Sequence, residues 1–146
     1  GLTVTARARL LGEECAFLRA NTEHHSLALY PLALRGALGL WEGSTLLSFG
    51  FKVSAYSQLR NAVLYLRNHG FEQVPLPAAL SPGMGHHAFF REPSGHLVQL
   101  YFEMSQIGAS FDASAAGADL PFESWPETIA ASPSCYRGEP YLGPVG

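Results

Sequence analysis

The clearest alternation of apolar and polar positions lies in residues 85–104, GHHAFFREPSGHLVQLYFEM. Two runs rich in aromatic and aliphatic residues, 86–91 and 96–103, predict two strands. Between them, Pro93 presets the backbone for a turn, and Gly95 supplies the positive-φ freedom that a closing position often needs. The segment is therefore predicted to be a hairpin, around which the rest of the chain is organised.

The second strand of this hairpin has two faces of different character. A period of two places Val98, Leu100 and Phe102 on one face, which is purely apolar. The other face mixes apolar and hydrogen-bonding groups: Leu97, Gln99, Tyr101 and Glu103. Such a strand is expected to pack on a helix with its first face and to line a pocket with its second.

Similar patterns predict strands over 2–10, 15–20, 24–30, 45–53 and 71–76. The Ala/Leu-rich residues 31–40 predict a short helical link, and 125–131 a short helix. The main helix is predicted over 55–69, with Ser54 as its N-cap and Gly70 as its terminator. Its apolar stripe, Leu59, Ala62, Val63 and Leu66, is expected to bury Phe49, Phe51, Val98, Leu100 and Phe102. The fold class predicted is α+β, with an antiparallel-rich sheet curled around a pocket and this helix on the convex side.

Composition narrows the class of protein. The 146 residues are 47% hydrophobic and carry a net charge of −3, with no basic cluster for nucleic acid. No apolar run has the length of a membrane span and no signal peptide opens the chain, so we expect a cytoplasmic protein. Cys15 and Cys135 form no CxxC pair; reduced thiols and a disulfide both stay open. We expect a domain over 1–104 and an extension over 105–146 that wraps the domain or a partner.

Two parts of the chain repeat. Ala16-Phe17-Leu18-Arg19 followed by His24 matches Ala88-Phe89-Phe90-Arg91 followed by His96, and a Leu-Tyr pair comes after each histidine. This similarity predicts an internal duplication. The second copy has the order strand, helix, strand, strand, strand, whereas the first shows only its last three strands.

A paired βαβββ module resembles the vicinal oxygen chelate superfamily, which includes glyoxalases, bleomycin-resistance proteins and extradiol ring-cleaving dioxygenases. FLRANTEHHSLAL, residues 17–29, is similar to the His-His strand of the dioxygenases' catalytic domain, and REPSGHLVQLY, residues 91–101, resembles their final hairpin. The resemblance covers about residues 2–104 and points to the C-terminal part of an extradiol-dioxygenase-like protein. It implies a βαβββ module over 45–103 and a partial module over 2–30 that together form a curved half-barrel sheet.

In the extradiol enzymes two histidines and one carboxylate hold Fe(II) or Mn(II). By this resemblance the second histidine ligand falls at Ser48, the carboxylate at Gln99, and a substrate-contacting tyrosine at Phe89. The strand that carries the first histidine has no counterpart in the sequence. The resemblance therefore implies an altered site without bound metal; Gln99 and Glu103 are the weak candidates for Fe(II) or Mn(II) if the site were rescued.

The candidate site residues, expected on one concave face, are His25, Ser48, His87, Phe89, Gln99 and Tyr101. His25 matches the acid–base histidine of the family and is the candidate catalytic residue; the others would contact substrate. The alternative is that these polar groups only satisfy one another. His24 and His86 are expected to point the other way as structural residues, and His96 to be exposed.

Three classes of function stay open. The first is a relative of ring-cleaving dioxygenases with an altered metal site that binds a small aromatic or apolar molecule. The second is a non-catalytic binding module, as in resistance proteins. The third is a fragment completed by another chain or segment, because an unpaired sheet edge predicts pairing with a second copy or with a missing N-terminal segment.

Overall fold

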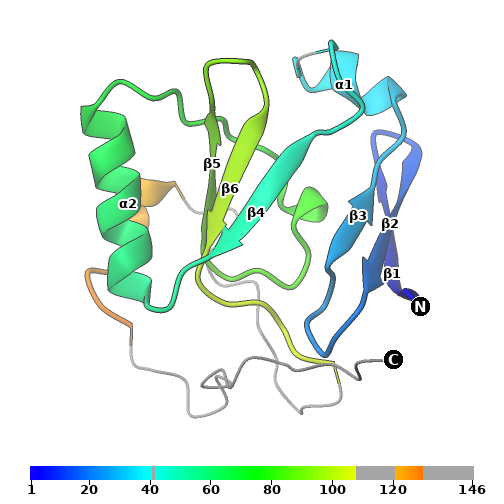
Figure 1. Cartoon of the computed structure of the whole chain (residues 1–146), viewed down its shortest axis with the longest axis horizontal. Helices are drawn as coiled ribbons and strands as arrows, with labels where there is room; N and C mark the ends of the chain where they lie inside the picture. Colours follow the sequence, from blue (N-terminus) through cyan, green and yellow to red (C-terminus); the bar gives the residue numbers. More distant parts are fainter. Residues whose placement is uncertain (41, 108–120, 130–146) are drawn as a thin grey trace.

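The computed structural model describes residues 1–40, 42–107 and 121–129, and it has two three-stranded sheets (Figure 1). The first sheet contains β1 (Thr3–Leu10), β2 (Glu13–Arg19) and β3 (Leu27–Leu29) in that order, all antiparallel. A short helix, α1 (Ala33–Ala37), follows as the sequence predicts. The predicted α+β class is confirmed.

The second sheet has the order β4-β6-β5. Its elements are β4 (Ser48–Lys52), the helix α2 (Tyr56–Asn68), β5 (His87–Arg91) and β6 (Leu97–Tyr101), with a 3-10 turn, η1 (Ala78–Leu80), before β5. β4 runs parallel to the central strand β6, and β5 runs antiparallel to it. The strand expected over 71–76 is reduced to an isolated bridge between Gln73 and Phe90.

The repeated hairpin has the same strand register in both sheets. In the second sheet, Ala88 pairs with Leu100 and Phe90 with Val98. In the first sheet the repeated positions pair in the same way: Ala16 with Leu29, and Leu18 with Leu27. The similarity of the two hairpins in sequence therefore corresponds to the same strand pairing in space.

Helix α2 packs on the convex side of the second sheet, as Figure 1 shows. Leu59 and Val63 are fully buried, and they form one cluster with Ala88 and Phe90 of β5. Leu100 and Phe102 pack against the same cluster. The period-two prediction that Leu100, and not Gln99, faces the helix is confirmed.

The same prediction was wrong for β4. Phe49 and Phe51 are 49% and 56% exposed instead of buried under α2. They lie on the helix side of the sheet, since they pair with Val98 and Leu100. However, β4 is the edge strand, and the packed cluster around α2 lies over β5 and β6 and does not include them.

The two ends of α2 differ in how well the sequence predicts them. The helix ends as expected: Gly70 has φ +78°, and the Phe71 N–H donates to the Leu66 carbonyl at 3.0 Å. The predicted Ser54 N-cap is wrong because the N-cap position falls at Ala55. The Ser54 hydroxyl instead donates to Gln58 Oε1 at 2.9 Å, which ties the incoming chain to the first turn.

Residues 121–129 pack against α2. Phe122 and Trp125 are buried in its cluster, and the Arg60 guanidinium donates to the Trp125 and Pro126 carbonyls at 3.0 Å. The helix expected over 125–131 was wrong in its described part, since 125–129 holds no helix and the 3-10 turn η2 (Phe122–Ser124) comes just before it. The remainder of the predicted extension, 108–120 and 130–146, lies outside the described residues.

Two expectations from composition can be compared with the structure. Cys15 is a free, fully buried thiol, whereas Cys135 lies outside the described residues. In the described ranges, no helix combines the length and apolar character that crossing a membrane requires.

Replacing Leu59 by alanine should lower the free energy of unfolding by about 2–5 kcal/mol, because it leaves a cavity in a fully buried cluster. Leu64→Ala is the matched control on the same helix, where the leucine is 41% exposed, and it should cost less than about 1 kcal/mol. Urea unfolding followed by circular dichroism measures both. Equal losses would show that α2 does not pack as described.

Candidate functional site

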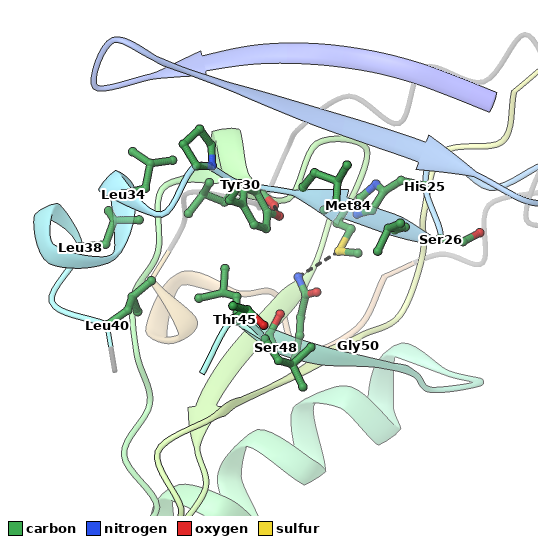
Figure 2. A pocket seen from close by; sticks show the side chains of 18 of the residues that line it. His25, Ser26, Tyr30, Leu34, Leu38, Leu40, Thr45, Ser48, Gly50 and Met84 are labelled. Atoms are coloured by element: carbon green, nitrogen blue, oxygen red, sulfur yellow. Dashed lines mark hydrogen bonds between the residues drawn. The ribbon is translucent and has the colours of Figure 1, made fainter. Parts of the chain in front are cut away.

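A cavity of about 530 Å³ lies between the two sheets (Figure 2). β3 and the link through α1 form one wall, and β4 and β6 form the other. Apolar residues outnumber polar ones in its lining, with leucines at 34, 38, 40 and 47. Polar groups are fewer, and they include His25, Tyr30, Thr45, Ser48, Gln99 and Tyr101. Cavities of roughly 300–1,000 Å³ with this composition are typical of small-molecule sites.

Gln99 is held in one orientation at the floor of the cavity. It is 7% exposed, and its Nε2 donates to Ser81 Oγ at 3.0 Å. The same atom donates to Met84 Sδ at 3.1 Å, which is the dashed line in Figure 2. A Cβ placed on Gly50 would lie 3.5 Å from Gln99 Oε1, so the backbone of β4 passes close to the amide oxygen. The amide nitrogen is thus occupied by protein acceptors.

Two tyrosines on opposite walls keep their phenolic protons. Burial, followed by the charge of Glu23, raises the pKa of Tyr101 to about 12. Burial also raises the pKa of Tyr30, whose hydroxyl donates to the Leu80 carbonyl at 2.7 Å. At neutral pH both side chains are neutral, and the Tyr101 hydroxyl can donate to or accept from a ligand.

His25 is a neutral imidazole at the cavity wall. Burial, with a smaller contribution from the neighbouring His24, lowers its pKa to about 4. The Nδ1 atoms of the two rings lie 3.1 Å apart, so one ring donates while the other accepts. Their tautomers are therefore linked, and His25 can serve a ligand as a hydrogen-bonding group or proton acceptor rather than as a cation.

This contact corrects the expectation that His24 points away from His25. Period-two alternation holds only in strands, and both residues precede β3, which begins at Leu27. In this irregular segment both rings pack edge-on against Phe17.

Four of the six predicted site residues, His25, Ser48, Gln99 and Tyr101, line the cavity, whereas His87 and Phe89 do not. Phe89 is buried in a separate cluster with Leu40, Val74 and Leu97, and the ring of His87 packs edge-on against it. Both belong to β5, which is separated from the cavity by β6. Glu103 is not a lining residue either; its charge acts on His86.

The two other histidine predictions have different outcomes. His86 packs against Tyr56 and Trp125, which is the structural position expected. His96 is half-buried rather than exposed, with Nδ1 3.3 Å from Glu92 Oε1. It belongs to the hairpin turn, where the Ser94 hydroxyl and backbone N–H groups lower the pKa of Glu92 to about 2.

The sequence prediction missed the cavity wall formed around α1. Leu34 and Leu38 come from a segment interpreted only as a link, and Tyr30 ends the strand predicted just before it. The spacing of Leu34 and Leu38 is one helical turn, which is the signal that could have identified a buried face. Met84 was missed because it lies in a Pro/Gly-rich loop without periodicity.

The residues present do not fit a hard divalent cation. Within the described ranges, no three His, Cys, Asp or Glu side chains come close enough to hold a metal ion together. Ser48 and Gln99, at the positions that the resemblance matches to ligands, supply no anionic charge, and the Gln99 amide is already hydrogen-bonded.

Comparison with known proteins identifies the architecture. Residues 48–105 match the family model of the catechol 2,3-dioxygenase-like N-terminal domain. Among solved structures, the chain is similar to the 2,3-dioxygenase LapB from Pseudomonas sp. KL28, with 21% identity and a TM-score of 0.55. It is also similar to 2,2',3-trihydroxybiphenyl 1,2-dioxygenase from Sphingomonas wittichii RW1 (23%, 0.56) and homoprotocatechuate 2,3-dioxygenase from Arthrobacter globiformis (18%, 0.54). The fold of this chain is similar to that of the extradiol dioxygenases.

The extent of this similarity is limited to one part of the dioxygenases. The match covers 77%, 75% and 73% of this chain but only 36%, 36% and 30% of the three dioxygenases, in the same order. No curated protein matches the sequence. The family model describes an N-terminal domain, whereas the ligand positions were matched to the catalytic domain, so those correspondences remain a proposal.

The low pKa of His25 predicts how stability depends on pH. The unfolded chain takes up a proton near pH 6.5 but the folded chain only near pH 4, so stability is lost as the pH falls through this window. His25→Gln should reduce the loss between pH 7 and 4 by on the order of 1 kcal/mol, allowing for partial exposure. His69→Gln, at the exposed end of α2, is the control. Identical pH profiles for both variants in urea unfolding would contradict the assignment.

Proposed function

We propose that this chain binds a small aromatic or apolar molecule between its two sheets, as a relative of ring-cleaving dioxygenases with an altered metal site. The observation that carries the proposal is the lining of the cavity: apolar residues are in the majority, and neutral polar groups lie among them, some at positions matched to the dioxygenase site. The lining also holds two charged side chains, but Glu23 is ion-paired with Lys52 and the Arg35 guanidinium donates to the Glu42 carbonyl. The remaining polar groups are neutral and offer hydrogen bonds to a neutral ligand.

The walls suggest how such a ligand would be held. Leu34, Leu38 and Leu40 offer an apolar surface near α1 for a ring or short chain. His25 and Ser48, on opposite sides of the cavity, could exchange hydrogen bonds with hydroxyl groups of the ligand. This arrangement binds and orients a molecule such as a phenol without requiring its deprotonation.

Ring cleavage by this chain alone does not follow from these residues. In the dioxygenases the metal supplies the chemistry, and here the matched positions offer only the neutral Ser48 and Gln99. His25 could accept a proton from a ligand hydroxyl, and that is the one acid–base role its neutral ring supports.

The second candidate function is that the chain forms one part of a larger dioxygenase. It is favoured by the coverage, since the chain spans about a third of the length of the three dioxygenases described above. Cytoplasmic location, pairing with a second copy, and the division into 1–104 and 105–146 remain predictions under either function.

Ligand binding can be tested with catechol and biphenyl as probes, by isothermal titration or NMR shift mapping. Ser48→Phe fills the cavity and should weaken binding by at least about tenfold. Ser57→Phe makes the same change on the exposed face of α2 and should leave binding unchanged. No binding at millimolar concentration, or equal binding by both variants, would disprove the proposal.

The metal site can be tested with Mn(II), and with Fe(II) under reducing conditions. The parent chain should show no ion at Ser48 and Gln99, whereas Ser48→His with Gln99→Glu should gain affinity by restoring an imidazole and a carboxylate. Isothermal titration and diffraction from soaked crystals measure this. A tightly bound ion in the parent, lost on Gln99→Ala or Glu103→Ala, would restore the dioxygenase interpretation.

A further inference from the structure

Both methionines of the chain and two of its six histidines gather at the end of the cavity away from α1 (Figure 2). His25, Met84 and Met104 line the cavity, and the ring of His24 contacts that of His25. Met84 and Met104 are 4% and 6% exposed and form one buried cluster with Tyr101. Imidazole and thioether groups are ligands of soft cations. This end of the cavity therefore has a set of donor groups that the neutral ligand proposed above does not use.

Backbone hydrogen bonds tie three segments of the chain together at this point. The His24 N–H donates to the Ser105 carbonyl at 2.8 Å, and the Ser105 N–H donates to the Gly83 carbonyl at 2.7 Å. Gly83 has φ +79°, and a Cβ on it would lie 3.0 Å from the Cβ and Cγ atoms of His24. An isolated bridge joins the neighbouring residues, Met84 and Met104. The backbone positions of these segments are therefore fixed relative to one another.

The two histidine rings present their Nδ1 atoms to each other. These atoms are 3.1 Å apart, and the ring centroids are 5.3 Å apart. The centroid separation is close to the Nδ1 separation plus the distance from each centroid to its own nitrogen. The two nitrogens therefore lie nearly on the line between the rings, and one carries a hydrogen while the other offers a lone pair. A cation with two ligands on opposite sides could take the place of that hydrogen.

This exchange requires only a small movement of the rings. Metal–imidazole bonds are about 2 Å long, so a cation between the two nitrogens would hold them about 4 Å apart instead of 3.1 Å. The ring of His25 borders the cavity, where it has room to move away from His24. Each ring would then carry its hydrogen on Nε2, so the exchange shifts one tautomer and releases no proton.

A thioether lies beside the same histidine pair. Met104 Sδ is 3.4 Å from the His25 backbone nitrogen, whose N–H donates to it. The sulfur of Met84 is directed elsewhere, because it accepts from Gln99 Nε2 at 3.1 Å. Met104 is therefore the methionine placed to act as a third ligand.

We propose that His24 Nδ1 and His25 Nδ1 bind a Cu(I) ion, with Met104 Sδ as a third ligand. Soft thioether and imidazole donors select Cu(I) over hard divalent cations. The surroundings are apolar, since Phe17 packs edge-on against both rings. A monovalent ion costs less to remove from water than a divalent one, so this environment also favours Cu(I).

The copper site lies beyond the proposed function, since it needs neither a ligand in the cavity nor the positions of Ser48 and Gln99. Copper binding is measured without catechol or biphenyl, and their binding is measured without copper. Failure of one test is therefore distinguishable from failure of the other.

The first test adds Cu(I), without oxygen, to the full chain carrying Cys135→Ser. One equivalent should shift the ring nitrogen NMR signals of His24 and His25 and the methyl signal of Met104, and should leave those of His69 in place. No binding at micromolar concentration would overturn the proposal. So would a bound ion that leaves the two histidine signals unchanged and shifts those of Cys15, the free thiol of the described residues.

The second test measures affinity by competition with bicinchoninate, a coloured Cu(I) chelator. His24→Gln should weaken binding by at least about a hundredfold, and Met104→Leu, which keeps the side-chain volume, by at least about tenfold. Met84→Leu, from the same buried cluster, is the matched control and should change the affinity by less than about threefold. Equal effects of the two methionine variants, or full affinity in His24→Gln, would contradict the assignment.

Two further measurements cover the remaining outcomes. Zn(II) should bind at least about a hundredfold more weakly than Cu(I), and equal affinities would show that the site is not selective for a soft ion. Circular dichroism checks that each variant folds. If His24→Gln does not fold, the histidine and methionine signals of the chain with both histidines present decide the outcome.

Discussion

The central position of β6 is the constraint on which the rest of the structure depends. β6 pairs with β4 on one side and β5 on the other, and its alternation decides what each face of the second sheet meets. Leu100 packs toward α2, while Gln99 and Tyr101 face the cavity. A slip of one residue would exchange these faces, placing an amide against the helix and a leucine at the floor of the cavity.

Desolvation sets the chemical character of the cavity. Leucine is the most frequent residue in the walls, and burial lowers the pKa of His25 while raising that of Tyr101, so both are neutral near pH 7. Gln99 and Ser48 are neutral at any pH. An ionised carboxylate at the position of Gln99 would need a nearby cation to offset its desolvation, whereas the amide is satisfied by Ser81 and Met84. Gln99 thus gives the cavity a buried polar floor whose amide nitrogen is satisfied by protein acceptors.

The two hairpins pair their strands in the same register, but the two sheets differ in how much of each is covered by other segments. In the second sheet, a fourth segment bridges at Gln73, β4 covers one edge of β6, and α2 covers the outer face. In the first sheet the same three-strand arrangement has its apolar outer face exposed and the edge of β3 unpaired among the described residues. Exposed sheet edges are where other strands can add, and the first sheet leaves both its β3 edge and its outer face uncovered among the described residues.

The sequence by itself determined the local structure: helix α2 and its glycine terminator, the hairpin of β5 and β6, the two faces of β6, and the duplication. These follow from periodicity and turn chemistry, which act over a few residues. Only the tertiary structure decided which faces are covered. It left Phe49 and Phe51 exposed on an edge strand, and it brought the rings of His24 and His25 together before β3. It also placed Phe89 on β5, with β6 between that strand and the cavity. It also formed a cavity wall from Leu34 and Leu38. The alternation along a strand predicts which residues share a face of the sheet. Whether that face is buried depends on segments that are distant in the sequence, and a local pattern cannot predict where those segments pack.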